Sequence, residues 1–297
     1  MKIAPINNDF AAQVGDIDLS RPLSDGMITK IEQAMDRYAV LIFRNQPLTD
    51  DQHAAFTRHF GAIDKGLLLG SKRKRRLPNP DVIDLANVDH EGNVLPAANI
   101  RNVSLVANQF WHSDSSFKNP PAKYSILCGM ELPAQGGQTE FADQRAAHDA
   151  LSADMKAKVR DLVAEHWAYH SRDLLGGSGA TPEERAALPP VFWPIVHTIP
   201  RSGRKSLFIG IHTREIEGMI TAEARMLLHD LLEHTTQRQF VHRHEWQAND
   251  VLMWDNQCTL HRGRAYDLTK LRQLRRCTTE VADGAAPQIS RGSVQGS

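Results

Sequence analysis

The chain has 297 residues, of which 41% are hydrophobic and 24% charged, and its 35 Lys and Arg residues balance its 35 Asp and Glu residues. This is the composition of an ordinary globular protein, and a balanced charge gives no overall field that would steer it to nucleic acid or to an anionic membrane. Its three cysteines form no C-x-x-C pair, and no apolar run approaches the length of a membrane span, which argues against a disulfide framework, a zinc knuckle and a membrane protein. We therefore predict a cytoplasmic protein that acts on a small molecule, without a nucleic-acid or membrane partner.

The beginning of the chain predicts a helix, a strand and a second helix. Apolar residues three and four apart predict an amphipathic helix over residues 24–38. The run Ala39-Val-Leu-Ile-Phe43 predicts a buried strand, and Arg44-Asn-Gln-Pro47 predicts the turn that ends it. Thr49 is placed to cap the second helix, whose acidic residues 50 and 51 suit the positive end of the helix dipole.

Residues 64–108 have little periodicity, and only short strands are predicted there, at 82–85 and 103–106. A long irregular segment in front of a candidate site is typical of a lid. The basic run Lys72-Arg-Lys-Arg-Arg76 could contact nucleic acid, but no aromatic residue is interleaved with it. A solvated loop, or one facing an anionic substrate, is the better interpretation.

The rest of the chain is dominated by short predicted strands. They are expected at 124–130, 138–142, 192–197, 206–211, 240–246, 251–254 and 275–281, and helices at 143–151, 152–165, after Thr181-Pro182 and at 221–235. Short strands with helices grouped outside them predict a mainly β fold with flanking helices, closed or sandwich-like. We expect a single catalytic domain over residues 1–283 and a disordered tail rich in Gly and Ser over 284–297.

The segment Trp111-His-Ser-Asp-Ser-Ser-Phe117 contains the first candidate site residues. His112 and Asp114 are two residues apart, and such residues of an extended segment point to the same side. An imidazole and a carboxylate there could provide two ligands of a 2-His-1-carboxylate metal triad. Composition alone produces roughly one His-x-Asp by chance, so a hydrogen-bonded histidine beside a turn aspartate remains the alternative. The third ligand could be His261, which follows a predicted strand in a polar turn.

Four motifs in a fixed order resemble the TauD/TfdA family of iron(II)- and 2-oxoglutarate-dependent dioxygenases, over residues 14–281. They are the segment at 111–117, Gly136-Gly-x-Thr-Glu-Phe141, Trp254-Asp-Asn-x-Cys-x-x-His-Arg262 and Arg272-x-x-x-Arg276. The resemblance implies a double-stranded β-helix, or jelly roll. It also implies that His112, Asp114 and His261 hold Fe(II), with open positions for 2-oxoglutarate and O2.

The same resemblance implies roles for residues around the metal. Arg272 and Thr139 match the family's partners of the distal carboxylate of 2-oxoglutarate, and Arg276 matches an arginine that holds an acidic co-substrate or substrate near the reacting centre. Asn108 and Ser115 match positions that line the substrate pocket, although turn capping explains both as well. Three other arginines are interpreted as salt-bridged strand ends: Arg262, Arg264 and Arg275.

Within the family, the resemblance is strongest to members that act on aryloxyalkanoates such as 2,4-dichlorophenoxyacetate. It implies hydroxylation of the carbon next to the ether oxygen, giving a phenol and glyoxylate together with succinate and CO2, by a homo-oligomeric enzyme. A small sulfonate, alkyl sulfate or other carboxylic acid remains an alternative substrate, and a metal-binding regulatory protein without turnover an alternative class. Leu69, in place of a lysine, and Ile199, in place of a histidine, depart from the family pattern on the substrate side.

Overall fold

The computed structural model of the chain describes residues 1–7, 9–65, 75–97, 99–176, 180–282 and 286–287. Leu69, most of the basic run, part of the glycine-rich segment before Thr181 and most of the C-terminal tail lie outside these ranges. None of the helices in the described ranges is long and apolar enough to cross a bilayer.

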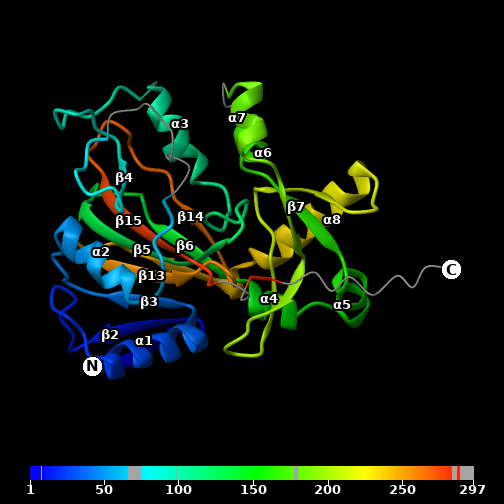
Figure 1. The fold of residues 1–297 in the computed structure, drawn as a ribbon, viewed down its shortest axis with the longest axis horizontal. Coiled ribbons are helices and arrows are strands. Elements are labelled where there is room, and N and C mark those ends of the chain that lie inside the picture. The colour runs from blue at the N-terminus through cyan, green and yellow to red at the C-terminus, as the bar shows by residue number, and fades with distance from the viewer. Residues whose placement is uncertain (8, 66–74, 98, 177–179, 283–285, 288–297) are drawn as a thin grey trace.

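The largest element is a seven-stranded sheet whose central strands come from distant parts of the chain (Figure 1). Its order is β1 (Lys2–Asn7), β2 (Ala11–Gly15), β3 (Val40–Phe43), β13 (Val251–Asp255), β5 (Ala122–Glu131), β15 (Gln273–Glu280) and β4 (Ile83–Ala86). Strand β13 pairs antiparallel with both β3 and β5. A strand from near the C-terminus therefore lies between two strands from the N-terminal half of the chain.

One face of this sheet is covered by α1 (Asp25–Tyr38) and α2 (Asp50–Arg58). Helix α1 has the limits that the sequence predicts within one residue, and α2 begins after the predicted cap Thr49. Helix α1 stops at Ala39, which adopts a left-handed conformation, and α2 starts with a capping box formed by Thr49 and Gln52. Alternate residues of β3 and β13 pack under these helices, among them Leu41 and Met253.

The opposite face of the large sheet carries a second, three-stranded sheet. Its order is β12 (Val241–His244), β6 (Thr139–Asp143) and β14 (Thr259–Gly263). Phe141 of β6 contacts Trp254 and shares a buried apolar cluster with Val40 and Leu252, residues of β3 and β13 that point away from the helices. The candidate site therefore lies on strands of two sheets that share one apolar core.

A further group of elements packs beside this core and has its own apolar cluster (Figure 1). Its strands are β7 (Val163–His166), β8 (Val191–Pro194), β9 (Val196–Thr198), β10 (Lys205–Leu207) and β11 (Thr213–Ile216). Its helices are α4 (Gln144–Asp149), α5 (Ala153–Val159), α6 (Ala168–Asp173), α7 (Pro182–Ala187) and α8 (Thr221–Thr235), and the short 3-10 helix η2 (Arg238–Phe240) joins α8 to β12. Helix α3 (Ile100–Ala107) lies apart from these elements, over the large sheet.

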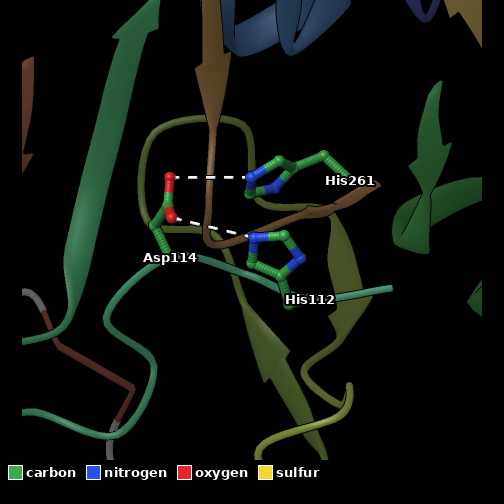
Figure 2. A group of neighbouring side chains, drawn as sticks. All are labelled: His112, Asp114 and His261. Atoms are coloured by element: carbon green, nitrogen blue, oxygen red, sulfur yellow. Dashed lines mark ion pairs between the residues drawn. The ribbon is translucent and has the colours of Figure 1, made fainter. Parts of the chain in front are cut away.

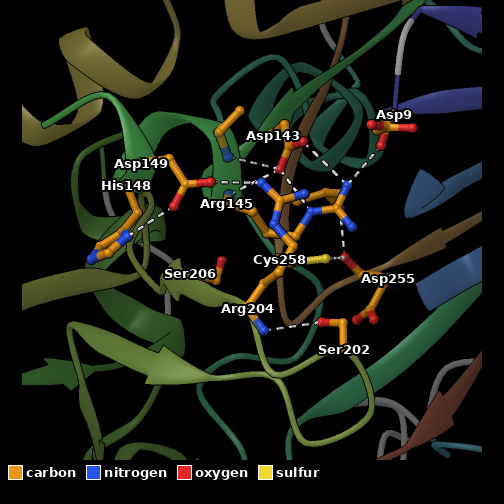
Figure 3. Close-up of polar contacts among 12 residues, drawn as sticks. Asp9, Asp143, Arg145, His148, Asp149, Ser202, Arg204, Ser206, Asp255 and Cys258 are labelled. Carbon is orange, nitrogen blue, oxygen red and sulfur yellow. Dashed lines mark hydrogen bonds and ion pairs between the residues drawn. The ribbon is translucent and has the colours of Figure 1, made fainter. Parts of the chain in front are cut away.

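Arg145 is a buried cation that ties β6 to α1 (Figure 3). It is 1% exposed, and its guanidinium donates to both carboxylate oxygens of Asp143 at 2.9 and 3.1 Å. The remaining donors reach the main-chain carbonyls of Asp36, Arg37 and Asp9 at 3.2–3.3 Å. Because every donor has a partner, this ion pair is compatible with burial and fixes the end of β6.

Two sequence predictions of secondary structure are wrong. Residues 103–106, predicted as a strand, lie in α3, because a short apolar run does not distinguish a buried strand from a helix. The helix predicted over 152–165 ends at Val159, and residues 163–166 form β7 between β8 and β11. Tertiary pairing overrides local propensity there.

Several predicted strand limits also differ from the structure. The strand predicted at 192–197 is divided between β8 and β9, and the strand predicted at 206–211 ends at Leu207. In the basic run, Arg76 forms a two-pronged ion pair with Asp84 at 2.6 and 2.7 Å, and Arg75 donates to the carbonyl of Pro80. These two cations are engaged locally.

Candidate active site

His112 and His261 are brought together by their own main chains. The two residues form an isolated antiparallel bridge, in which each amide donates to the other's carbonyl, at 3.0 and 2.8 Å. Their rings lie 4.1 Å apart between centroids. Asp114 faces both rings: its carboxylate oxygens lie 4.0 Å from Nε2 of His112 and 3.7 Å from Nε2 of His261 (Figure 2). The three predicted ligands therefore converge.

Both imidazoles are prepared to act as neutral ligands. Burial lowers the pKa of His112, and it lowers the pKa of His261 well below its usual value, although the nearby Asp114 carboxylate opposes both shifts. Nδ1 of His112 lies 2.8 Å from the carbonyl of Phe110. Since a carbonyl only accepts, the proton is assigned to Nδ1, which leaves the lone pair of Nε2 facing Asp114.

Asp114 is held as a charged carboxylate. Burial alone would raise its pKa, but the positive charge of Arg276, supported by the hydrogen bond from Ser125, outweighs burial and holds the pKa well below its usual range. Arg276 forms an ion pair with one carboxylate oxygen, and the Ser125 hydroxyl donates to the other at 2.7 Å. The orientation of the carboxylate is thus fixed from both sides.

Asn256 completes the support of the triad from behind. Its side-chain carbonyl accepts from the amide of Asp114 and from Nε1 of Trp254, both at 3.0 Å, and its amide donates to Ser125 at 3.0 Å. In the Trp254-Asp-Asn motif, the asparagine therefore positions the metal-ligand candidate Asp114 through its main chain and through Ser125.

The donor set is suited to a divalent transition metal. His112, Asp114 and His261 are the only group of three or more His, Cys, Asp or Glu residues in the described chain whose ligand atoms lie within 4.8 Å of one another. Two imidazole nitrogens and one carboxylate form the 2-His-1-carboxylate triad of non-haem Fe(II) oxygenases. All three side chains are at most 9% exposed, so a bound ion would be largely shielded from water.

A cavity that is partly open to solvent adjoins the two histidines. Arg272 and Thr139 lie in its wall, 8% and 3% exposed. Burial lowers the pKa of Arg272, whose side chain has no carboxylate partner in the described residues and donates only to the carbonyl of Gly137 at 3.1 Å. The Thr139 hydroxyl accepts from Nε1 of Trp246 at 3.0 Å, so its own proton remains available to a ligand.

The predicted substrate residues separate in the structure. Asn108 and Arg276 line the cavity, whereas Ser115 is not part of its wall and donates its hydroxyl to Asp64 at 2.6 Å. Most of the remaining wall is apolar. It consists of Leu85, Leu105, Leu127, Trp254 and Leu274.

The sequence matches the model of the family described as "Taurine catabolism dioxygenase TauD, TfdA family" over residues 2–278. The chain belongs to the TauD/TfdA family. It is 48% identical over 275 residues to the α-ketoglutarate-dependent 2,4-dichlorophenoxyacetate dioxygenase of Cupriavidus pinatubonensis, covering 93% of this chain and 96% of that relative. It is also 33% identical to the (S)-phenoxypropionate/α-ketoglutarate-dioxygenase of Sphingobium herbicidovorans, covering 91% of each chain.

Among solved structures, this TauD/TfdA family member is similar to AAD-2 in complex with Mn(II) and N-oxalylglycine. The TM-score is 0.89 at 40% identity, and the match covers 97% of this chain and 100% of that one. The predicted sheet-rich fold with flanking helices, of the TauD dioxygenase type, is thereby confirmed.

In this family member, sequence reasoning missed several residues around the site. Ser125 gave no signal, because a serine inside an apolar strand belongs to no motif until its partner Asp114 is placed beside it. Tyr266 lines the cavity, although the sequence placed it in no role. Arg264, interpreted from the sequence as a salt-bridged strand end, lies 3.8 Å from the Glu140 carboxylate and also lines the cavity. The strand-end interpretation holds for Arg262, which pairs with Glu140 at 2.8 Å, and for Arg275, which pairs with Asp50 at 2.6 Å.

Proposed function

We propose that this protein is an Fe(II)- and 2-oxoglutarate-dependent dioxygenase that hydroxylates the carbon next to the ether oxygen of an aryloxyalkanoate. The observation that carries the proposal is the convergence of His112, Asp114 and His261 beside a cavity that also contains two buried anion-binding groups, Arg272 and Thr139. A metal triad with an adjacent arginine suits a 2-oxo acid, which presents a chelating end and a distal carboxylate.

The triad residues hold Fe(II), and Arg272 holds the distal carboxylate of 2-oxoglutarate with the help of the Thr139 hydroxyl. Burial of a guanidinium without a carboxylate partner costs desolvation free energy, and a bound carboxylate offsets this cost. When bound, Fe(II) supplies O2 activation coupled to decarboxylation of 2-oxoglutarate to succinate and CO2. Arg276 contributes by keeping Asp114 ionised and by placing a positive charge at the acid end of the substrate.

The apolar wall selects an aryl group rather than a small sulfonate. Leu127, Leu274 and Trp254 offer surface that an aromatic ring buries favourably, whereas taurine has no comparable apolar part. Asn108, at the rim of the same cavity, can donate to the substrate acid. The relatives named for 2,4-dichlorophenoxyacetate and phenoxypropionate support this substrate class.

The protein's share of the reaction is positioning and exclusion of water. The arginines hold two acids so that one C–H bond of the substrate faces the metal position. Hydroxylation of the carbon between the ether oxygen and the carboxylate gives a hemiacetal, which collapses to a phenol and glyoxylate. The ether bond is thus broken without direct hydrolysis.

The remaining proposals concern the framework around the site. We propose that the seven-stranded sheet and the β12-β6-β14 sheet are the two walls of a double-stranded β-helix, supported by the core that Phe141 and Trp254 share. Residues 1–283 then form one catalytic domain. Within the proposed lid segment, residues 64–108, β4 is paired in the large sheet, and the support for a lid is α3, whose Leu105 lines the cavity. The cysteines of the described chain are unpaired and buried, which suits the cytoplasm. A homo-oligomeric state stays a prediction, which light scattering would test.

The decisive experiment is anaerobic addition of Fe(II) and 2-oxoglutarate to the metal-free protein. We expect a visible charge-transfer band, a shift of that band with 2,4-dichlorophenoxyacetate, and no shift with taurine or an alkyl sulfate. His112→Ala, which removes one ligand, should abolish the band and succinate formation.

The outcomes separate the parts of the proposal. A band that shifts only with taurine or an alkyl sulfate would keep the reaction class and replace the substrate. A folded protein that forms no band and no succinate would refute the dioxygenase, and the metal-binding regulatory alternative would then stand.

A further inference from the structure

Tyr266 places a second unsatisfied donor beside Arg272. Its hydroxyl is buried in the cavity wall and finds no hydrogen-bond partner among the described residues, and the same holds for Nε of Arg272. The Arg272 guanidinium lies 5.2 Å from the centre of the Tyr266 ring, a cation–π distance. Buried donors without partners are costly, so two of them in the wall of one cavity indicate a place for an anion.

The main chain around Tyr266 fixes its position relative to Arg272. Gly136 and Gly137 have φ of +78° and +71° and form a turn in which Gly136 packs against Tyr266 and Gly137 against Arg272. A Cβ atom at Gly136 would lie 2.5 Å from the carbonyl oxygen of Ala265, and one at Gly137 would lie 3.1 Å from Nε of Arg272. Gly136 therefore admits no side chain without a shift of the main chain, the positive φ of both residues favours glycine, and the turn brings Thr139 to the same wall.

We propose that Tyr266 is a further anchor of the 2-oxo acid: its hydroxyl donates a hydrogen bond to the distal carboxylate that Arg272 and Thr139 hold. This inference rests on the proposed function, since it concerns the same co-substrate. Burial raises the pKa of Tyr266, so the hydroxyl keeps its proton at neutral pH and acts as a donor. The ring has a separate role as the surface on which Arg272 lies.

The test compares Tyr266→Phe, which keeps the ring and removes the hydroxyl, with Tyr266→Leu, which removes both. Binding of 2-oxoglutarate to protein loaded with Mn(II) is measured by calorimetry, so that turnover is not involved. A hydrogen bond to a carboxylate predicts roughly tenfold weaker binding in Tyr266→Phe. Tyr169→Phe is the matched control, because that hydroxyl donates to the carbonyl of Glu184 and does not line the cavity.

Oxalate serves as the control ligand, because it can chelate the metal and has no distal carboxylate. We expect the two Tyr266 variants to bind oxalate as the unchanged protein does, which also shows that their metal site is intact. The role of the hydroxyl would be overturned if Tyr266→Phe bound 2-oxoglutarate as tightly as the unchanged protein does. It would also be overturned if this variant lost affinity for oxalate and for 2-oxoglutarate equally. Failure of the unchanged protein to bind 2-oxoglutarate would instead overturn the proposed function.

Discussion

Replacing Ser125 by alanine tests whether the residues behind the triad set its affinity for metal. Ser125 is fully buried on β5, and its hydroxyl donates to Asp114 at 2.7 Å while it accepts from Asn256 at 3.0 Å. The substitution removes one oxygen atom and leaves all three metal-ligand candidates themselves unchanged. Its effect on metal binding must therefore act through the orientation and charge of Asp114.

The expected magnitude follows from the charge on the acceptor. A hydrogen bond to a charged group contributes about 1.5–3 kcal/mol, which is roughly a ten- to hundredfold change in a binding constant. Loss of the groups that support metal ligands costs about the same in metal affinity. Arg276 still holds the other oxygen of Asp114, so we expect the lower part of this range.

The assay is titration of metal-free protein with Mn(II), with free Mn(II) followed by electron paramagnetic resonance. Ser206→Ala is the matched control, because Ser206 is equally buried, on β10, but donates to the carbonyl of Leu207. We expect Ser206→Ala to leave the affinity unchanged and Ser125→Ala to weaken it about tenfold. Equal affinities for the two variants would refute the role assigned to Ser125.

Two further predictions concern stability. Arg145→Ala leaves the Asp143 carboxylate buried without its partner, so it should lower the free energy of unfolding by about 3–5 kcal/mol in urea titrations. Arg160→Ala is the control, because it breaks an exposed ion pair, and it should change the free energy of unfolding by less than about 0.5 kcal/mol. An equal effect of the two variants would contradict the stabilising role of the buried ion pair between Arg145 and Asp143. Stability of the metal-free protein should also fall, on the order of 5 kcal/mol, between pH 6.5 and pH 5. Burial lowers the pKa of His242 from 6.5 to about 4 and that of three further histidines as far or further, so the unfolded chain binds more protons in this window. Among the described residues, Asp255, whose pKa burial raises to about 6, opposes the loss. The three further histidines are His53 (pKa about 4), His166 (about 3) and His197 (about 4). Urea titrations at the two pH values measure the free energy of unfolding. A value that is equal or higher at pH 5 would refute the assignment of the pH dependence to these buried histidines.

Local sequence predicted the elements whose signals lie within a few residues. The limits of α1, β3 and α8 agree with the sequence predictions almost to the residue. For the helices, the reason is that the apolar residues of one face and the capping residues lie only three or four positions apart in the sequence. Strand β7 and helix α3 were missed, because which of two conformations a short apolar run adopts depends on the neighbours it pairs with.

The sequence by itself determined the chemistry of the site, because the family motifs name the donor types and their order along the chain: His112, Asp114 and His261, then Arg272 and Arg276. Only the tertiary structure decided what surrounds them. Ser125 lies behind Asp114, Tyr266 lies against Arg272, and Ser115 turns away to Asp64. The physical reason is that a ligand type is a property of one residue, whereas burial, hydrogen-bond partners and the shape of a cavity arise only when strands far apart in the chain are paired.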